Sequence, residues 1–184
     1  TSNIFSKSCY WAYAFDINKD LINCYNVIKY KVEDLIQKLD KKEKEFLALD
    51  KDERQKYFYN IRTEYNSYLL DNEIDVKRAS EFIFLNRTCF NGLYRVNKNG
   101  KFNVPCGKYK NPTICDSNNL RNLSKLLKNV VFAYGDYKES EKLVDENTFV
   151  YFDPPYRPLS VTSGFTSYTK EDFKQIFIDL GIEK

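Results

Sequence analysis

The stretch that decides the fold is TFVYFDPPY, residues 148–156. Its apolar, β-prone run VYF predicts a short buried strand. Asp153 follows directly, so we expect it at the carboxyl end of that strand, where open α/β sheets bind ligands. Pro154 and Pro155 have fixed φ angles and no N–H groups, so the turn is stiff and its carbonyls are free to accept hydrogen bonds.

These residues suit a flat ligand that carries an amino group. The Asp153 carboxylate and the Pro154 carbonyl can accept hydrogen bonds from an exocyclic NH2, and the ring of Tyr156 can stack on a base. By itself DPPY is a weak signal, because four residues recur by chance. A plain Asp-Pro turn at a strand end has the same sequence.

Three blocks carry a wider resemblance, in this order: FDINKDLINCYNVIK at 15–29, FNGLYRVNKNGKFNVPCGKYKNP at 90–112 and DPPYRPLSVTSGFTSY at 153–168. Together they resemble the Dam-like and DpnM-like (D12 class) DNA adenine-N6 methyltransferases, which read GATC. A divergent insert lies at about residues 38–68. The resemblance implies an α/β fold, a Rossmann-like S-adenosylmethionine-dependent methyltransferase sheet with an inserted helical and β-hairpin DNA-recognition region.

We therefore expect three segments. Residues 1–37 form the first part of the catalytic α/β domain, 38–115 the helical insert and hairpin target-recognition region, and 116–184 the remainder of the catalytic domain with DPPY. Apolar spacing and capping residues predict the elements. They are a strand at 9–16, a helix at 18–39 capped by Asn18 or Asp20, exposed helices within 41–70, a helix at 76–85, a helix at 117–128 capped by Asp116, and a buried strand at 130–134.

The expected cofactor residues lie at strand ends. Asp16 falls between a strand and a helix, where an acid in nucleotide-binding α/β folds accepts hydrogen bonds from ribose hydroxyls. From the residues alone, a cap or turn role for Asp16 stays open. The resemblance implies that Asp16 contacts the ribose of S-adenosylmethionine, that Tyr137 packs on its adenine beside Asp136, and that Asp153 also lies at the cofactor. A plain strand-end turn fits Asp136 and Tyr137 equally well, whereas we expect Asp20 to be a solvated or capping residue.

The stretch between Glu81 and Asp116 contains six Lys and Arg residues and no acid, and aromatic residues lie between them. Phosphate is the natural partner of such a stretch. The sequence NKNG at 97–100 predicts a hairpin turn in which Asn and Gly supply positive φ. A short basic hairpin fits a DNA groove, although a surface hairpin on a basic protein has the same pattern.

The resemblance implies DNA contacts for particular residues. Arg95 corresponds to an arginine that reads guanine, and Arg to guanine O6 and N7 is the commonest bidentate base contact. The other implied contacts are Leu93 and Pro105 at thymine methyls, Phe90 as a wedge in the base stack when adenine flips out, Asn91 at the gap left behind, Tyr109 and Lys110 on the backbone, and Phe165 in an aromatic region over the flipped base. The family usually has Tyr where this chain has Phe90.

The implied activity is direct methyl transfer from S-adenosylmethionine to adenine N6 in double-stranded DNA, after base flipping. Its catalytic residues are Asp153, Pro154, Pro155 and Tyr156, and no metal is required. Two alternatives stay open. One is a DNA-binding remnant without catalysis, and the other is an amino-methyltransferase that acts on RNA or protein.

The composition limits the classes of protein and of functional site that are compatible with this chain. A length of 184 residues suits one domain with a core, and a net charge of +3 is mild. The absence of His excludes His-based triads and the usual His zinc sites. Five Cys without a C-x-x-C pair fit free thiols in a reducing cytoplasm, and we expect a cytoplasmic monomer without a membrane span. Because no Met is present and the family's Gly-rich loop is missing, we expect a fragment that binds S-adenosylmethionine weakly.

Overall fold

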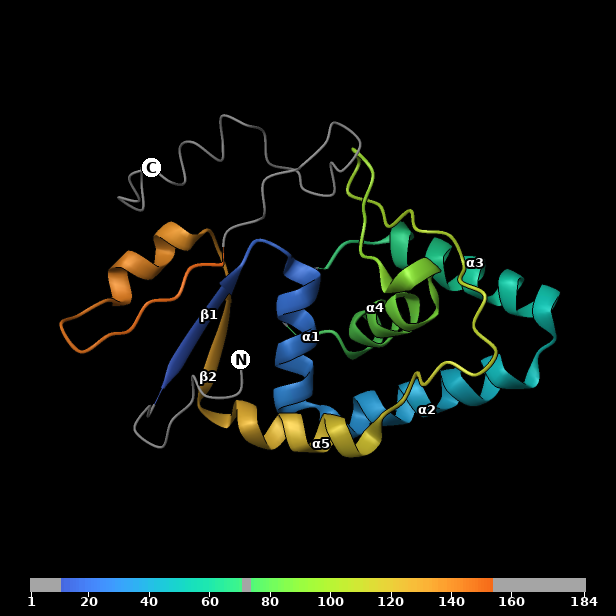
Figure 1. Ribbon diagram of the computed structural model, residues 1–184, viewed down its shortest axis with the longest axis horizontal. Coiled ribbons are helices and arrows are strands. Elements are labelled where there is room, and N and C mark those ends of the chain that lie inside the picture. The colour runs from blue at the N-terminus through green and yellow to red at the C-terminus, as the bar shows by residue number, and fades with distance from the viewer. Residues whose placement is uncertain (1–10, 71–73, 154–184) are drawn as a thin grey trace. The chain divides into compact units, whose positions relative to one another are not determined.

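The computed structural model describes residues 11–70 and 74–153 (Figure 1). The chain divides into two compact units, residues 1–143 and 144–184. The described helices and strands all belong to the first unit. In order they are β1 (Ala12–Asp16), α1 (Lys19–Tyr30), α2 (Val32–Ala48), α3 (Lys51–Ser67), α4 (Val76–Thr88), the 3-10 turn η1 (Phe90–Gly92), α5 (Ser117–Leu126), η2 (Leu127–Asn129), β2 (Val130–Tyr134) and η3 (Tyr137–Leu143).

The two strands lie side by side as a parallel pair (Figure 1). Ala12 pairs with Val130 at one end and Asp16 with Tyr134 at the other. A parallel pair needs a long crossover connection, which helices α1 to α5 supply here. The prediction of a mixed α/β fold with parallel strands is thus confirmed at this level, and β2 has the predicted bounds.

Helix α1 packs against the sheet. The ring of Tyr25 stacks on Phe132 of β2, with centroids 4.6 Å apart and planes 5° apart. Asn18 caps the helix as predicted, because its Oδ1 accepts from the N–H groups of Asp20 and Leu21 at 3.1 and 3.2 Å. The expected cap of α5 by Asp116 is also confirmed, with Oδ1 accepting from Asn119 N–H at 3.0 Å.

The predicted single helix at 18–39 is wrong. The chain leaves helical geometry at Lys31, where φ is −138° and ψ is 37°, so α1 ends and α2 begins on either side of it. No Gly or Pro marks this break. Its physical reason is tertiary packing, since the buried faces around Val27 and around Leu35 and Leu39 pack separately into the same core.

Helices α2, α3 and α4 surround one aromatic cluster. Phe84 of α4 is fully buried, and the rings of Phe46, Tyr57 and Phe58 lie with centroids 5.4, 5.6 and 6.5 Å from it. Truncating a buried Phe to Ala costs about 3–5 kcal/mol. The cluster therefore fixes the predicted helical insert onto α4, which runs three residues beyond its predicted end to Thr88.

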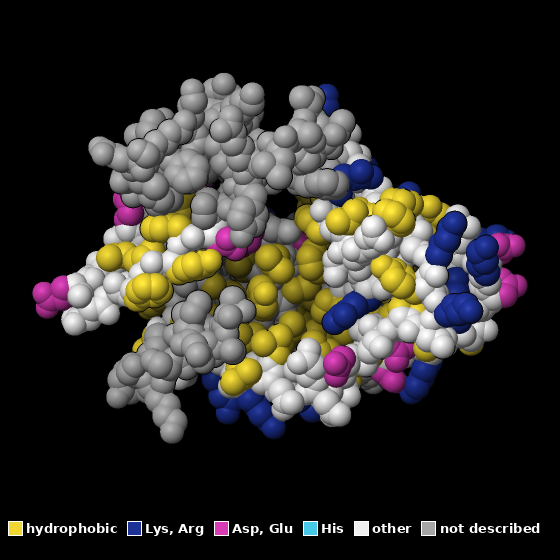
Figure 2. Space-filling view, viewed as in Figure 1, with side chains coloured by type: hydrophobic (Ala, Val, Ile, Leu, Met, Phe, Trp, Pro, Cys, Tyr) yellow, Lys and Arg dark blue, Asp and Glu magenta, His cyan; other side chains and the backbone are white. Residues whose placement is uncertain are grey.

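The surface separates apolar and basic regions. Figure 2 shows hydrophobic side chains over the sheet and α1, and Lys and Arg side chains over the end where α2 and α3 meet. In the described residues no helix is both long enough and apolar enough to span a membrane.

Candidate nucleic-acid interface and cofactor edge

The carboxyl ends of β1 and β2 bring two predicted cofactor segments together. The Gly135 N–H donates to the Asp16 carbonyl at 3.2 Å, so the turn that carries Asp136 and Tyr137 starts beside Asp16. Asp136 shapes that turn, because its Oδ1 accepts from Lys138 N–H at 3.2 Å. Asp16 and the turn that carries Asp136 and Tyr137 therefore lie at the same edge of the parallel sheet.

The Asp16 side chain is half-buried, and its Oδ1 accepts from the Asn18 N–H at 2.7 Å. This hydrogen bond orients the carboxylate at the first turn before α1. A carboxylate is purely an acceptor, so this position fits the hydroxyl donors of a ribose. That Asp16 binds a cofactor ribose stays a prediction, as do the cofactor contacts of Asp136 and Tyr137.

The run VYF before Asp153 does not form the predicted buried strand. Residues 148–153 have no strand structure, and Tyr151 and Phe152 are 65% and 39% exposed. A strand is held by backbone hydrogen bonds to a neighbour. Within the described residues the sheet consists of β1 and β2 alone, so no neighbouring strand pairs with this run. Asp153 is exposed, and Pro154, Pro155, Tyr156 and Phe165 lie outside the described residues.

The predicted hairpin is present. Val96 and Phe102 form an antiparallel bridge, and the Asn97 N–H donates to the Lys101 carbonyl at 2.8 Å. Only Gly100 takes positive φ in the turn, at 71°, so the expectation that Asn also does so is wrong. Asn97 instead closes the turn with its Oδ1, which accepts from the N–H groups of Asn99 and Lys101.

The implied DNA-contacting residues lie on two neighbouring segments. The Phe90 N–H donates to the Pro105 carbonyl at 2.9 Å, and Cys89 and Cys106 form an antiparallel bridge beside it. The left-handed Asn91, with φ 54°, and Gly92, with φ 60°, then reverse the chain toward Leu93. Six of the seven described residues are exposed and Leu93 is half-buried; the six are Phe90, Asn91, Arg95, Pro105, Tyr109 and Lys110.

Two of these side chains have a geometry that suits contact with a nucleic acid. Phe90 is 50% exposed on a tight turn, so its ring can insert into a stack of bases. The Arg95 guanidinium is held by Asn103, whose Oδ1 accepts from Arg95 Nε at 2.7 Å. The exposed Lys98, Lys101 and Lys108 lie on the same acid-free stretch and suit phosphate.

Sequence reasoning missed the contribution of α3, whose side chains hold the recognition segment by its backbone. Arg54 Nη1 donates to the Lys110 carbonyl at 2.6 Å, and Arg62 Nη1 donates to the Val104 carbonyl at 3.2 Å. Asn66 bonds both backbone groups of Phe102. The only sequence signal is the spacing of 54, 62 and 66, which is compatible with one helical face.

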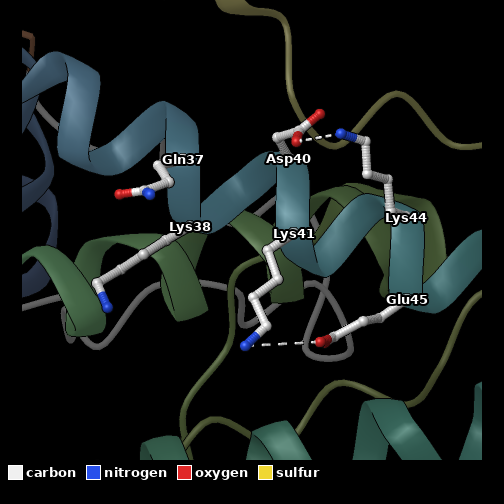
Figure 3. Close-up of a pocket in the computed structure, with 6 residues that line it drawn as sticks. All are labelled: Gln37, Lys38, Asp40, Lys41, Lys44 and Glu45. Atoms are coloured by element: carbon white, nitrogen blue, oxygen red, sulfur yellow. Dashed lines mark hydrogen bonds and ion pairs between the residues drawn. The ribbon is translucent and has the colours of Figure 1, made fainter.

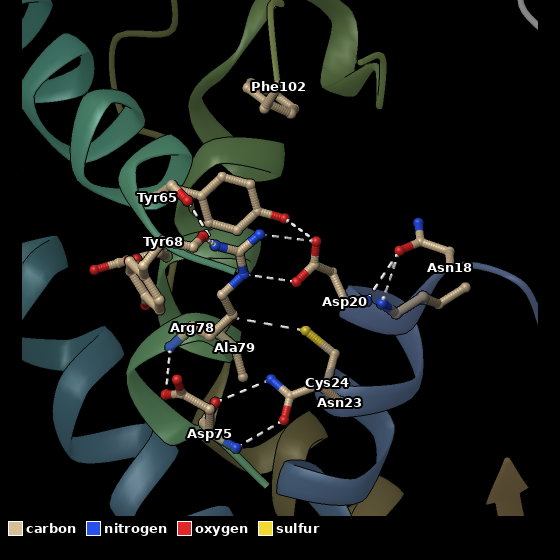
Figure 4. A network of polar contacts seen from close by, with 12 residues as sticks. Asn18, Asp20, Asn23, Cys24, Tyr65, Tyr68, Asp75, Arg78, Ala79 and Phe102 are labelled. Carbon is tan, nitrogen blue, oxygen red and sulfur yellow. Dashed lines mark hydrogen bonds and ion pairs between the residues drawn. The ribbon is translucent and has the colours of Figure 1, made fainter. Parts of the chain in front are cut away.

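Sequence reasoning also misjudged Asp20. Figure 4 shows that Asp20 points at the guanidinium of Arg78 rather than into solvent, with Tyr65 donating to Asp20 Oδ2 at 2.7 Å. The reason is position: the first turn of α1 packs against α4, which places an acid and an arginine 58 residues apart in contact. Tyr94 is close by, and partial burial of its hydroxyl together with the charge of Asp20 raises its pKa.

A hollow along α2 is not a candidate site (Figure 3). Two of its three lysines already face carboxylates of the same helix, with Lys44 Nζ 2.6 Å from Asp40 and Lys41 Nζ 3.8 Å from Glu45. These i,i+4 pairs are exposed and screened by solvent, so they contribute little to stability. None of the predicted site residues lines the hollow.

The sequence of this chain is similar to those of known proteins. The model of the D12 class N6 adenine-specific DNA methyltransferases matches residues 2–183. The chain belongs to this family. Type II methyltransferase M.MjaIII of Methanocaldococcus jannaschii is 55% identical over 158 residues, which cover 86% of this chain and 54% of that protein.

Two further relatives are less similar. Type II methyltransferase M1.LlaDCHI of Lactococcus lactis is 41% identical over 86% of this chain and 54% of its own length. A DNA adenine methylase of Serratia marcescens is 36% identical over 93% of this chain and 60% of its own length. This member of the D12 class therefore spans a little over half the length of the curated relatives it matches.

Proposed function

We propose that this D12-class chain provides the DNA-reading and base-binding part of an enzyme that methylates adenine N6 in double-stranded DNA at GATC, with S-adenosylmethionine as donor. The observation that carries the proposal is the recognition segment. It combines an exposed Phe90 on a left-handed turn with Arg95 oriented by Asn103, on an acid-free basic stretch.

The segment suits base flipping in two steps. Phe90 wedges into the base stack as the adenine flips out, with Asn91 at the gap left behind, and stacking of an aromatic side chain on bases contributes about 1–3 kcal/mol per base. Arg95 presents two parallel N–H donors to guanine O6 and N7, which discriminates that base by about 1–3 kcal/mol. The exposed lysines of the hairpin neutralise phosphates irrespective of sequence.

At the base, Asp153 and the Pro154 carbonyl accept from the N6–H groups and keep the nitrogen lone pair directed outward, while Tyr156 stacks on the ring. S-adenosylmethionine supplies an electrophilic methyl group on a sulfonium. The N6 lone pair would take up this methyl group as the sulfonium S–C bond breaks, and the proton lost from N6 would pass to the Asp153 carboxylate or to solvent. Asp16 orients the donor through ribose hydroxyls, so the protein contributes position and electrostatics.

The test is transfer of labelled methyl from S-adenosylmethionine to short duplexes. A GATC duplex should be labelled, whereas a duplex with N6-methyladenine in both strands and one with a substituted guanine should not. Retention of the GATC duplex without labelling would favour a DNA-binding remnant. Preferential labelling of RNA or of a protein amine in competition would reject the DNA assignment.

A further inference from the structure

We propose that Asn66 is a positioning residue that fixes Arg95 for base discrimination. This inference rests on the proposed function, in which Arg95 reads guanine. Asn66 lies near the carboxyl end of α3, within the insert to which the sequence assigned no chemistry. In this proposal it contacts no DNA, and it acts through the backbone of the recognition hairpin.

The first link is a two-way contact between Asn66 and Phe102. Asn66 Nδ2 donates to the Phe102 carbonyl at 2.9 Å, and the Phe102 N–H donates to Asn66 Oδ1 at 2.8 Å. One side-chain amide therefore satisfies both polar backbone groups of this residue, as a neighbouring strand would. The hairpin strand is thereby joined to a helix 36 residues earlier in the chain.

The ring of Phe102 strengthens the same anchor. It is only 3% exposed, and it packs against Tyr65 of α3, with centroids 6.3 Å apart and planes 83° apart. On its other side Tyr94, the neighbour of Arg95, lies with its ring centroid 6.0 Å away. Figure 4 shows the Phe102 ring beside Tyr65, so the side chain of Phe102 is fixed to α3 as its backbone is through Asn66.

The second link passes from Phe102 to the next residue, Asn103. Its N–H donates to the Arg95 carbonyl at 3.1 Å, and its Oδ1 accepts from Arg95 Nε at 2.7 Å. The path from Asn66 to the guanidinium consists of covalent bonds and hydrogen bonds alone. Since an exposed Arg otherwise loses rotamer freedom on binding, a pre-set guanidinium lowers that cost and aligns its donors.

The experiment compares affinities of the 184-residue chain for a GATC duplex and for one with the guanine replaced. Asn66→Ala removes both hydrogen bonds to Phe102 and should lower the ratio of the two affinities by about two- to tenfold. The matched control is Asn60→Ala, the same change at an exposed position of the same helix, which should leave the ratio unchanged. Hydrogen exchange should show faster exchange at 95–103 and unchanged protection in α4.

A double-mutant cycle tests whether Asn66 acts through Arg95. In an Arg95→Ala background, Asn66→Ala should change the affinity ratio no further. The positioning role would be overturned if Asn66→Ala left the affinity ratio unchanged, which includes an equal loss of affinity on both duplexes. It would also be overturned if the losses in the cycle were additive. Either outcome would leave the proposed function intact. A wild-type chain that binds both duplexes alike would instead overturn the guanine assignment of Arg95, and this inference with it.

Discussion

Arg78 of α4 and Asp20 of α1 form a bidentate ion pair, with Nε 2.7 Å from Oδ1 and Nη2 3.1 Å from Oδ2. The same guanidinium donates from Nη1 to the carbonyls of Tyr65 and Tyr68 at the end of α3, at 2.5 and 2.7 Å. Carbonyls at a helix end lack intrahelical partners. One largely buried arginine therefore closes α3 and joins it to α1 and α4 (Figure 4).

Arg78→Ala should destabilise the chain by about 3–5 kcal/mol, because it leaves Asp20 charged and largely buried without its partner. The control is Arg121→Ala, which removes an equally short but exposed pair with Glu33 and should leave stability nearly unchanged, because solvent screens that pair. Urea unfolding of both variants measures the difference. Similar small losses would mean that water reaches the Arg78 pair.

Glu81 should make stability depend on pH. Burial raises the pKa of this carboxyl above its ordinary 4.5, and the hydroxyl of Tyr68, which donates to Oε2 at 3.1 Å, offsets this only in part. Oε1 makes no hydrogen bond within the described residues, and Lys77 Nζ lies 3.8 Å from it. A raised pKa in the folded state means that protonation favours folding, so stability is lost as pH rises through that pKa.

Glu81→Gln should therefore be more stable than the wild type at about pH 7, and the difference should shrink toward about pH 4, where both states of Glu81 are protonated. Unfolding midpoints in urea at the two pH values provide the measurement. A variant that is less stable than the wild type at neutral pH, by a margin that shrinks toward acid pH, would show that the ion pair with Lys77 outweighs the cost of burial.

Arg95→Ala should relax sequence preference, with a loss of about 1–3 kcal/mol confined to one guanine position. Lys98→Ala and Lys101→Ala should weaken binding to every duplex and flatten its salt dependence, because these exposed lysines meet phosphates. Titrations with GATC and singly substituted duplexes at two salt concentrations separate the two behaviours. An equal loss on all duplexes for Arg95→Ala would identify it as a phosphate contact.

In a full-length version of the protein, Asp153→Ala should abolish methyl incorporation and leave duplex affinity nearly unchanged, because the carboxylate is assigned to the target amine rather than to phosphate. The motif contains no second acid that could replace it. Labelled-methyl assays and binding titrations on the same GATC duplex give the two readouts. Incorporation at the wild-type rate would exclude Asp153 from the chemistry.

The sequence predicted those features that depend on neighbouring residues. The strand 130–134, the caps Asn18 and Asp116 and the hairpin turn at 97–100 all arise from local patterns. The sequence did not predict features that depend on contacts between residues far apart in the chain. The break at Lys31, the burial of Asp20 and the bracing of Phe102 by Asn66 depend on pairs 36 or more residues apart or on packing, and no local pattern encodes them.

The strand predicted at VYF was wrong for a related reason, because a strand also depends on a partner elsewhere in the chain. Catalytic roles for Asp153 and its motif stay predictions. The position of the sheet edge could be predicted from the sequence, since the parallel strands end together at Asp16 and Tyr134. The groups that bind a ligand at this edge could not be predicted, because they depend on the ligand.

The recognition hairpin divides into a fixed base and an independent tip. Arg95, Phe102 and Asn103 are tied to one another and to α3, whereas Lys98 and Asn99 are exposed at the tip. Asn97 closes the turn and Gly100 has a φ of 71°, so these two positions must keep their residues. The side chains at positions 98 and 99 can therefore be exchanged without disturbing the arginine beneath. Under the proposed function, a change at position 98 alters a contact with phosphate while Arg95 still reads the same guanine, and position 99 can carry a spectroscopic label.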